Sequence, residues 1–360
     1  MPARPTESKD TWKTSESAQE QGLEYVRDAY QVPLSDRPSL FPDTADVPLI
    51  DLGGLWKDPA RRPAVFKDIG NACRCSGFFQ IVNHGICQTV MDEALHAASS
   101  FLGLPAEEKM KYMSSNVHEP VRYATSLKDG IDKIQFWRVF LEHYAHPLEH
   151  WMGHWPENPP HYRYRLFHLP EKMGKFCAEA RNLTVKLMEA ITEGLGLGPS
   201  YLTSKMEEGM QVMAVNCCPP CPDPEVALGL PPHSDYTCLT VVLQGSPGLQ
   251  IMDLEDCTWK SIPKTPGALQ VHVGDHMEVL SDGLYKSVVH RAVLNSEQTR
   301  ISIASLHSLG MNETVEPAEE LVGVHGKKYR GSSFRDLLNF LASNDLGEGK
   351  SFISTLMINQ

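Results

Sequence analysis

Short apolar runs separated by turn residues recur along the chain after about residue 211. They read MAVN, CLTVVL, GLQIM, ALQVHV, YKSVV and RISIASL, and the turns GSPG, KTPG and SDG lie between them. Runs of this kind are typical of an antiparallel sandwich or barrel, whereas parallel sheets alternate strands with helices. The sequence therefore predicts a double-sheet β-barrel in this part of the chain.

The chain before residue 211 has mainly helical spacing. Apolar residues recur every three or four positions in three stretches, and two short apolar runs fit buried strands. The segment PLEHWMGHWPENPP predicts an irregular crossing, because it is rich in Pro and Trp. The predicted helices cover residues 62–75, 89–102 and 171–195, and the predicted strands cover 47–52 and 77–82.

These patterns divide the chain into four parts and predict an α+β fold. Residues 1–45 form a polar N-terminal tail and lead-in, and 46–205 form a mostly helical N-terminal region. Residues 206–310 form the barrel. Residues 311–360 form a C-terminal extension with a helix at 333–345.

Composition and charge exclude some classes of binding partner. The 360 residues are 41% apolar with a formal net charge of −12 and no basic stripe, so we expect no nucleic acid and no membrane partner. The polar N-terminus lacks the apolar stretch of a signal peptide. Nine cysteines without an export signal predict reduced thiols in a cytoplasmic protein, which we expect to be a monomer. The CCPPC cluster lacks the second Cys/His pair of a zinc ribbon.

Two His-x-acid pairs stand out among the fifteen histidines. His233 and Asp235 form one pair, and His276 and Glu278 form the other. Residues i and i+2 of a strand face the same side, so either pair can offer a nitrogen and an oxygen to one metal ion. A histidine from another strand completes a two-His-one-carboxylate set with open positions, which suits non-haem Fe(II).

His290 is the candidate third ligand for both pairs. The spacing predicts that His276 and His290 lie on neighbouring strands of one hairpin across the turn SDG, so the pair with Glu278 stays open. The pair of His233 and Asp235 lies much earlier in the chain, and a rolled double sheet can bring it opposite His290. We favour the set of His233, Asp235 and His290, because a site between two sheets is better enclosed than the edge of a hairpin.

Arg300 and Ser302 share one face of the predicted strand TRISIAS. A guanidinium binds a carboxylate through two parallel hydrogen bonds, and a hydroxyl adds a third. An arginine that enters an apolar barrel needs such a partner, because burying an unpaired charge is costly. The two residues therefore predict an anchor for an anionic cosubstrate close to the metal.

Six sequence segments, taken in their order along the chain, match the pattern of a known protein family. Between residues 47 and 306 they read VPLIDL, GFFQIVNHGI, VNCCPPCPDPEVALGLPPHSD, GLQIM, GDHMEVLSDGLYKSVVHRAV and TRISIA. Together they resemble the plant-type 2-oxoglutarate/Fe(II)-dependent dioxygenases, the group that contains flavanone 3-hydroxylase, flavonol synthase, anthocyanidin synthase and the gibberellin oxidases. The resemblance implies a distorted double-stranded β-helix, or jelly-roll, with a helical N-terminal region and flanking helices.

The resemblance also implies cofactors and the residues that bind them. Fe(II) and 2-oxoglutarate would be bound in the barrel, with ascorbate as a candidate reductant. The implied residues are His233, Asp235 and His290 for Fe(II), Arg300 and Ser302 for the distal carboxylate of 2-oxoglutarate, and Asn216 for a further contact to it.

Three places depart from the family pattern. Cys218 stands where relatives usually carry a tyrosine, and Leu306 stands where flavonoid-processing relatives carry a phenylalanine that stacks on the substrate. Residues 164–170 resemble an insertion. Tyr123, Phe136 and Leu306 are the candidates for the substrate pocket, and the alternative for Phe136 is a place in the core.

These features predict an enzyme that hydroxylates or desaturates a small plant metabolite with oxygen and 2-oxoglutarate. A flavonoid-like phenolic is the expected substrate, and a gibberellin or another hormone, terpenoid or alkaloid is the alternative. Two other classes are a zinc hydrolase and a catalytically silent small-molecule-binding protein. The anchor of Arg300 and Ser302 argues against the hydrolase, and the intact ligand set argues against the binding protein.

Overall fold

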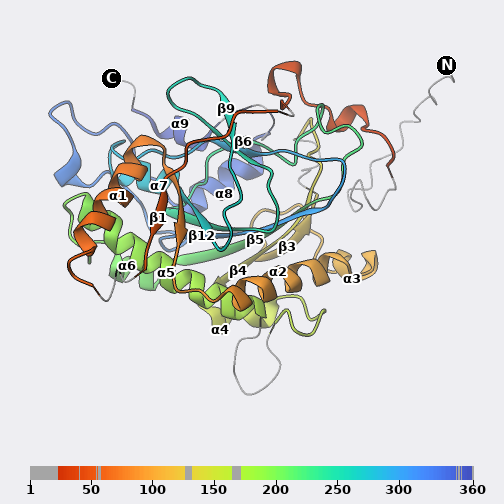
Figure 1. Ribbon diagram of the computed structural model, residues 1–360, viewed down its shortest axis with the longest axis horizontal. Helices are drawn as coiled ribbons and strands as arrows, with labels where there is room; N and C mark the ends of the chain where they lie inside the picture. Colours follow the sequence, from red (N-terminus) through yellow and green to blue (C-terminus); the bar gives the residue numbers. More distant parts are fainter. Residues whose placement is uncertain are drawn as a thin grey trace.

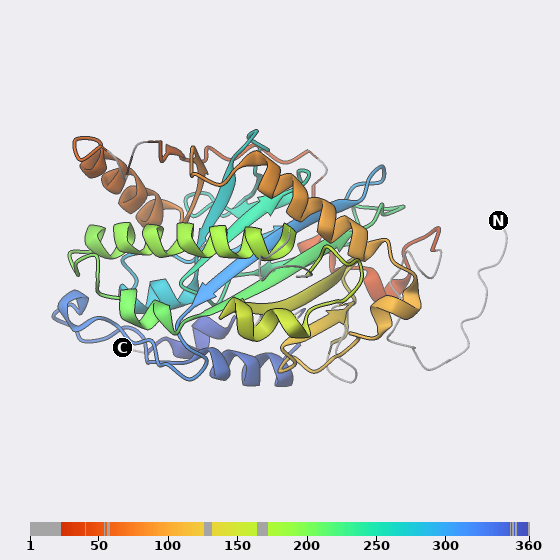
Figure 2. The same cartoon turned by 90° about the horizontal axis from the view of Figure 1, so that it is seen from below.

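The computed structural model describes residues 23–39, 41–53, 55, 58–125, 132–163, 172–345, 347, 349 and 351–358. It consists of two facing β-sheets with helices packed against the outer face of the larger sheet (Figures 1 and 2). The first 22 residues of the predicted tail and the predicted insertion at 164–170 lie outside these residues. No helix within the described ranges has the length and apolar character needed to cross a membrane.

The larger sheet has eight strands in the order β1-β2-β10-β7-β12-β5-β4-β3. β1 and β2 pair in parallel, and the other neighbours pair antiparallel. The strands are β1 Leu49–Asp51, β2 Phe78–Val82, β3 Val121–Ala124, β4 Val139–His146, β5 Met210–Cys218, β7 Leu239–Gln244, β10 Leu269–Val273 and β12 Arg300–Ser308.

The smaller sheet has four antiparallel strands in the order β6-β11-β8-β9. They are β6 Leu230–His233, β8 Leu249–Met252, β9 Trp259–Ser261 and β11 His290–Ala292. The two sheets face each other as the sides of a jelly-roll, which confirms the predicted fold class.

The long helices α1 Arg62–Cys75, α2 Gln88–Leu102 and α5 Lys172–Gly194 agree closely with the three predicted helices. In Figure 2, α5 and α2 lie across the strands of the large sheet. The predicted C-terminal helix is α8 Phe334–Ser343. The shorter helices are α3 Ala106–Met110, α4 Leu148–Trp151, α6 Thr203–Glu207, α7 Asp275–Leu280 and α9 Phe352–Leu356, with 3-10 turns at Asp28–Tyr30, Leu34–Asp36, Met152–His154 and Glu319–Leu321.

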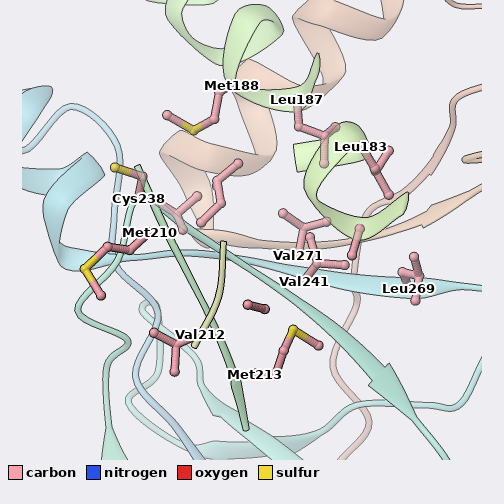
Figure 3. Packing of buried hydrophobic residues seen from close by; sticks show 14 of the residues in the cluster. Leu183, Leu187, Met188, Met210, Val212, Met213, Cys238, Val241, Leu269 and Val271 are labelled. Carbon is pink, nitrogen blue, oxygen red and sulfur yellow. The ribbon is translucent and has the colours of Figure 1, made fainter. Parts of the chain in front are cut away.

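Strand alternation separates the core from the space between the sheets. Leu183 and Leu187 of α5 lie over Val241 of β7 and Val271 of β10, in the main hydrophobic core (Figure 3). The neighbouring Thr240 points to the other side and lines the cavity between the sheets. The strands β3, β4, β5, β7, β10 and β12 therefore contribute one set of residues to packing and the alternate set to the cavity.

Two predictions about local structure need correction. The segment predicted as an irregular crossing contains α4 and a 3-10 turn. The N-terminal region is less helical than predicted, because β3 and β4 from this region form one edge of the large sheet. The domain boundaries at residues 46, 206 and 311 stay predictions.

Candidate active site

A cavity of about 300 Å³ lies between the two sheets. Its wall takes residues from β3, β4, β5, β7, β10 and β12 of the large sheet, and from β6, β8 and β11 of the small sheet. Residues of α8 and α9 also line it. The cavity is the place where polar side chains distant in sequence come together.

His233, Asp235 and His290 converge at one end of this cavity. His233 ends β6 and His290 begins β11, where the two are paired across the ladder. Asp235 follows β6 by two residues, and its Oδ1 lies 3.7 Å from Nε2 of each histidine. The three candidate ligand atoms all lie within 4.8 Å of one another.

Both imidazoles are oriented by backbone carbonyls. Nδ1 of His233 lies 2.8 Å from the carbonyl oxygen of Pro231, and Nδ1 of His290 lies 3.1 Å from that of Val288. Burial lowers the pKa of both histidines, so they are neutral at pH 7. The carbonyls place the ring proton on Nδ1, which leaves the lone pair of each Nε2 facing Asp235.

Asp235 supplies the negative charge of the site. Burial opposes its ionisation, but the neighbouring His290, His272 and His233 hold its pKa below the usual range. Two neutral imidazoles and one carboxylate oxygen form the two-His-one-carboxylate set that binds non-haem Fe(II). The donor set therefore fits this metal.

Arg300 and Ser302 of β12 line the same cavity. Arg300 is only 4% exposed, and burial lowers its pKa. Its Nη1 donates to Oγ of Ser302 at 3.3 Å, while its buried Nε has no hydrogen-bond acceptor among the described residues. A buried guanidinium with a donor left over fits an incoming carboxylate such as that of 2-oxoglutarate.

Asn216 and Cys218 lie opposite this anchor on β5. The ladder pairs Ser302 with Asn216 and Arg300 with Cys218. Oδ1 of Asn216 accepts a hydrogen bond from Nη1 of Arg138 at 2.6 Å. Burial raises the pKa of the Cys218 thiol, against the opposing effect of the nearby Arg300 and Arg138 guanidiniums. Asn216 and Cys218 therefore form part of the same wall as the predicted carboxylate anchor.

Cys218 is tightly enclosed. A Cβ placed on Gly229 would lie 2.6 Å from Sγ of Cys218, so the glycine makes room for the thiol. A tyrosine at position 218 would need a displacement of this neighbouring backbone. The close approach of Gly229 therefore fits the small side chain at position 218.

Leu306 lines the cavity, but the other two predicted pocket residues do not. Tyr123 is 1% exposed and packs edge-on against Phe101 in the core, because strand alternation turns Arg122 rather than Tyr123 to the cavity. Phe136 packs in a small separate hydrophobic cluster outside the cavity. The predictions for Tyr123 and Phe136 are therefore wrong.

Phe140 is the aromatic residue of β4 that does line the cavity. Its ring lies between two guanidiniums, with Arg122 at 4.8 Å and Arg138 at 4.6 Å from its centroid. Arg122 also pairs with Glu142 at 3.0 Å. The apolar residues on the remaining side come from the C-terminal helices and are Leu337, Phe340, Leu341 and Phe352.

The alternative pair of His276 and Glu278 is not a ligand pair. The prediction that it lies on a strand is wrong, since residues 275–280 form α7, where positions i and i+2 point in different directions. Nδ1 of His276 lies 2.7 Å from Oγ of Ser308. Glu278 accepts hydrogen bonds from the Ser287 backbone and the Tyr329 hydroxyl.

One histidine beside the ligand set was not predicted. His272 of β10 lines the cavity, and its Nδ1 lies 3.3 Å from Oδ2 of Asp235. In the sequence it is a single histidine inside the apolar run ALQVHV, which is typical of an ordinary core residue. Only the pairing of the strands brings it to Asp235.

Comparisons with known proteins agree with this geometry. Residues 209–308 match the family model of the 2OG-Fe(II) oxygenase superfamily. Residues 47–160 match a second family model, described as "non-haem dioxygenase in morphine synthesis N-terminal". The chain is 49% identical over 325 residues to 2-oxoglutarate-dependent dioxygenase 21, chloroplastic, from Oryza sativa subsp. japonica, which covers 90% of this chain and 94% of the relative. It is 46% identical over 327 residues to flavanone 3-dioxygenase 3 from the same organism, which covers 90% and 97%.

A solved structure gives the same answer for the fold. The crystal structure of JOX2 in complex with 2OG, Fe and JA superposes with a TM-score of 0.80 at 29% identity, covering 96% of this chain and 98% of that one. The protein is therefore an enzyme that uses Fe(II), 2-oxoglutarate and oxygen to oxidise a small plant metabolite. Its ligand set, its fold and its relatives agree, and the chain belongs to the 2OG-Fe(II) oxygenase superfamily.

Proposed function

We propose that His233, Asp235 and His290 bind the catalytic Fe(II), and that Arg300 and Ser302 bind the distal carboxylate of 2-oxoglutarate. The observation that carries this assignment is the convergence of the three ligand atoms within 4.8 Å, in the same cavity as an arginine with an unused Nε donor. Bound Fe(II) supplies the activation of oxygen, coupled to the oxidative decarboxylation of 2-oxoglutarate to succinate and carbon dioxide.

The protein's own residues position the reactants. Arg300 and Ser302 orient the cosubstrate along β12, so that its keto-acid end faces the proposed metal ligands. The hydrogen bond from Arg138 keeps the Asn216 side chain in the cavity wall. The apolar side chains of β12, α8 and α9 exclude water from the reacting groups.

We propose that the substrate is a flavonoid-like phenolic that lies against Phe140 and Leu306. The Phe140 ring and the apolar residues Phe340 and Phe352 form the sides of the cavity that a flat ring can contact. Arg122 and its partner Glu142 are polar groups within reach of a phenolic hydroxyl. The similarity to flavanone 3-dioxygenase 3 supports the same substrate class.

A small carboxylic acid is the second candidate substrate. The Arg138 guanidinium beside the Phe140 ring adds positive charge to the cavity beyond that of Arg300, whereas the charge of Arg122 is paired with Glu142. The structurally similar JOX2 was solved in complex with JA in addition to 2OG and Fe. Substrates with and without a carboxylate therefore belong in the same assay.

Succinate release provides the test. Anaerobically purified protein is mixed with Fe(II), 2-oxoglutarate and a panel of flavanones, gibberellins and other small acids, and oxygen is then admitted. We expect succinate in proportion to an oxidised flavanone, and omission of ascorbate tests that reductant. Succinate linked only to an acid would replace the flavonoid proposal, and turnover that needs zinc but no 2-oxoglutarate would refute the assignment of the site.

We further propose that the enzyme acts in the cytoplasm as a monomer. All nine cysteines are free thiols, which suits a reducing compartment. A fluorescent protein fused to the C-terminus would show the location in plant cells. Signal in chloroplasts would refute the cytoplasmic location, and a dimer mass by light scattering would refute the monomer.

A further inference from the structure

We propose that His272 is a positioning residue, which holds the second carboxylate oxygen of Asp235 and thereby directs the first oxygen toward the metal. This inference rests on the proposed metal site. The two oxygens of Asp235 face different groups: Oδ1 lies 3.7 Å from Nε2 of both His233 and His290, whereas Oδ2 lies 3.3 Å from Nδ1 of His272.

The two polar groups of this contact depend on each other. His272 is 1% exposed, and neither of its ring nitrogens makes a hydrogen bond to a described residue. Oδ2 of Asp235 is also buried and makes no hydrogen bond elsewhere in the described ranges. Leaving such a group unpaired costs about 1–3 kcal/mol. A hydrogen bond from Nδ1 to Oδ2 would satisfy both of these atoms after a small reorientation of the ring or the carboxylate, since the two atoms already lie 3.3 Å apart.

His272 is held firmly in place by its strand and by two rings. In the large sheet it pairs with Phe78 of β2 and Thr240 of β7. Its ring centroid lies 5.1 Å from the Phe78 ring and 4.6 Å from the His290 ring, edge-on to the latter. The large sheet thereby supports a carboxylate whose two histidine partners belong to the small sheet.

The contact has a chemical consequence for the site. An Asp235 oxygen that is engaged by His272 is not free to turn toward the metal, so the carboxylate offers one ligand atom and leaves positions open for cosubstrate and oxygen. Residues that orient metal-binding carboxylates typically change metal affinity by about 10–100-fold when they are replaced. We expect His272 to fall in this range.

Metal binding in the absence of turnover tests the proposal. His272→Leu removes the donor at similar volume, and His272→Asn keeps a donor at the position of Nδ1. His272→Gln moves that donor toward the position of Nε2, away from Asp235. His276→Leu is the matched control, because His276 is another fully buried histidine and bonds Ser308 instead. Each variant is titrated anaerobically with Co(II), with the visible absorption spectrum as a second readout.

We expect His272→Leu and His272→Gln to bind Co(II) about 10–100-fold more weakly with an altered spectrum. His272→Asn and His276→Leu should bind as the wild type does. Wild-type affinity and spectrum in His272→Leu would overturn the positioning role, and so would an equal loss in His272→Asn and His272→Gln. If His272→Leu does not fold, the comparison of Asn with Gln decides.

His233→Ala separates this proposal from the one on which it rests. If His233→Ala loses Co(II) binding while His272→Leu and His272→Gln retain it fully, the metal site stands and the role of His272 falls. If the wild type binds no Co(II), or if His233→Ala binds it equally well, the metal site and the positioning role fall together.

Discussion

Replacement of Arg300 by lysine tests the carboxylate anchor. The guanidinium donates to Ser302 through Nη1 and keeps a buried Nε without an acceptor among the described residues. Lysine preserves the positive charge but supplies a single ammonium group in place of the planar fork. The substitution therefore removes the paired hydrogen-bond donors of the guanidinium and keeps the positive charge.

The expected effect follows from the hydrogen bond that is lost. A hydrogen bond to a charged group contributes about 1.5–3 kcal/mol, and each 1.4 kcal/mol corresponds to a tenfold change in affinity. Loss of one of the two parallel bonds should raise the KM for 2-oxoglutarate by about 10–150-fold. The KM for the oxidised substrate should change much less, because Arg300 is proposed to bind the cosubstrate.

The assay is succinate formation at varied 2-oxoglutarate, with Arg291→Lys as the control. Arg291 is equally buried, donates to Gln250 and stacks on Trp259, but it points away from the cavity. Both variants lose a buried guanidinium, so a general loss of stability would affect them alike. An unchanged 2-oxoglutarate requirement in Arg300→Lys, or an equal rise in Arg291→Lys, would refute the anchor.

Three further predictions address the metal, the substrate and the stability of the fold. His233→Ala should weaken Fe(II) binding by more than about 100-fold, the upper range for a residue that only orients a ligand; retained Fe(II) and full turnover would contradict this. Leu306→Phe should lower the KM for a flat phenolic about 2–10-fold, since an aromatic pair contributes about 0.5–1.5 kcal/mol. The KM for 2-oxoglutarate should stay constant, and a change in that value alone would place the substrate elsewhere. Burial lowers the pKa of His143, His276 and His307 to about 3, so these histidines are neutral in the native protein, while the unfolded chain takes up protons below about pH 6.5. Stability is therefore present above pH 6.5 and lost as the pH falls toward 3, by up to about 1.4 kcal/mol per pH unit for each histidine. Urea unfolding of the metal-free protein between pH 7.5 and 5 measures this slope, and a flat profile would disprove it.

The convergence of His233 with Asp235 and of Arg300 with Ser302 could be predicted because the spacing within each pair is short, whereas the addition of His290 depended on the rolled double sheet. His233 and Asp235 are two residues apart at the end of β6, and Arg300 and Ser302 are two residues apart on β12, where one strand period relates them. The jelly-roll was predictable from the turns between apolar runs. These features depend on residues close together in the sequence, so they can be recognised without the structure.

The incorrect predictions concern the phase of a strand or contacts between distant segments. Tyr123 and Arg122 are neighbours, and one residue decides which of them faces the cavity. His276 lies on α7 because the chain turns at Gly274, where an added Cβ would lie 2.2 Å from the Thr237 carbonyl oxygen. That close approach joins segments far apart in sequence, and the segment GDHMEVL does not reveal it.

The alternation along β12 has a consequence for how the enzyme can change. Arg300 and Ser302 face the cavity at one end of the strand, and Ala304 and Leu306 face it further along. At about 3.3 Å per residue, position 306 lies roughly 20 Å from position 300. We therefore expect mutations at 304 and 306 to change the substrate while the proposed cosubstrate anchor at 300 and 302 persists. An inserted residue between the two pairs would instead turn the side chains of one pair toward the helix-covered core. We therefore expect related enzymes to diverge by replacement at these positions and not by insertion.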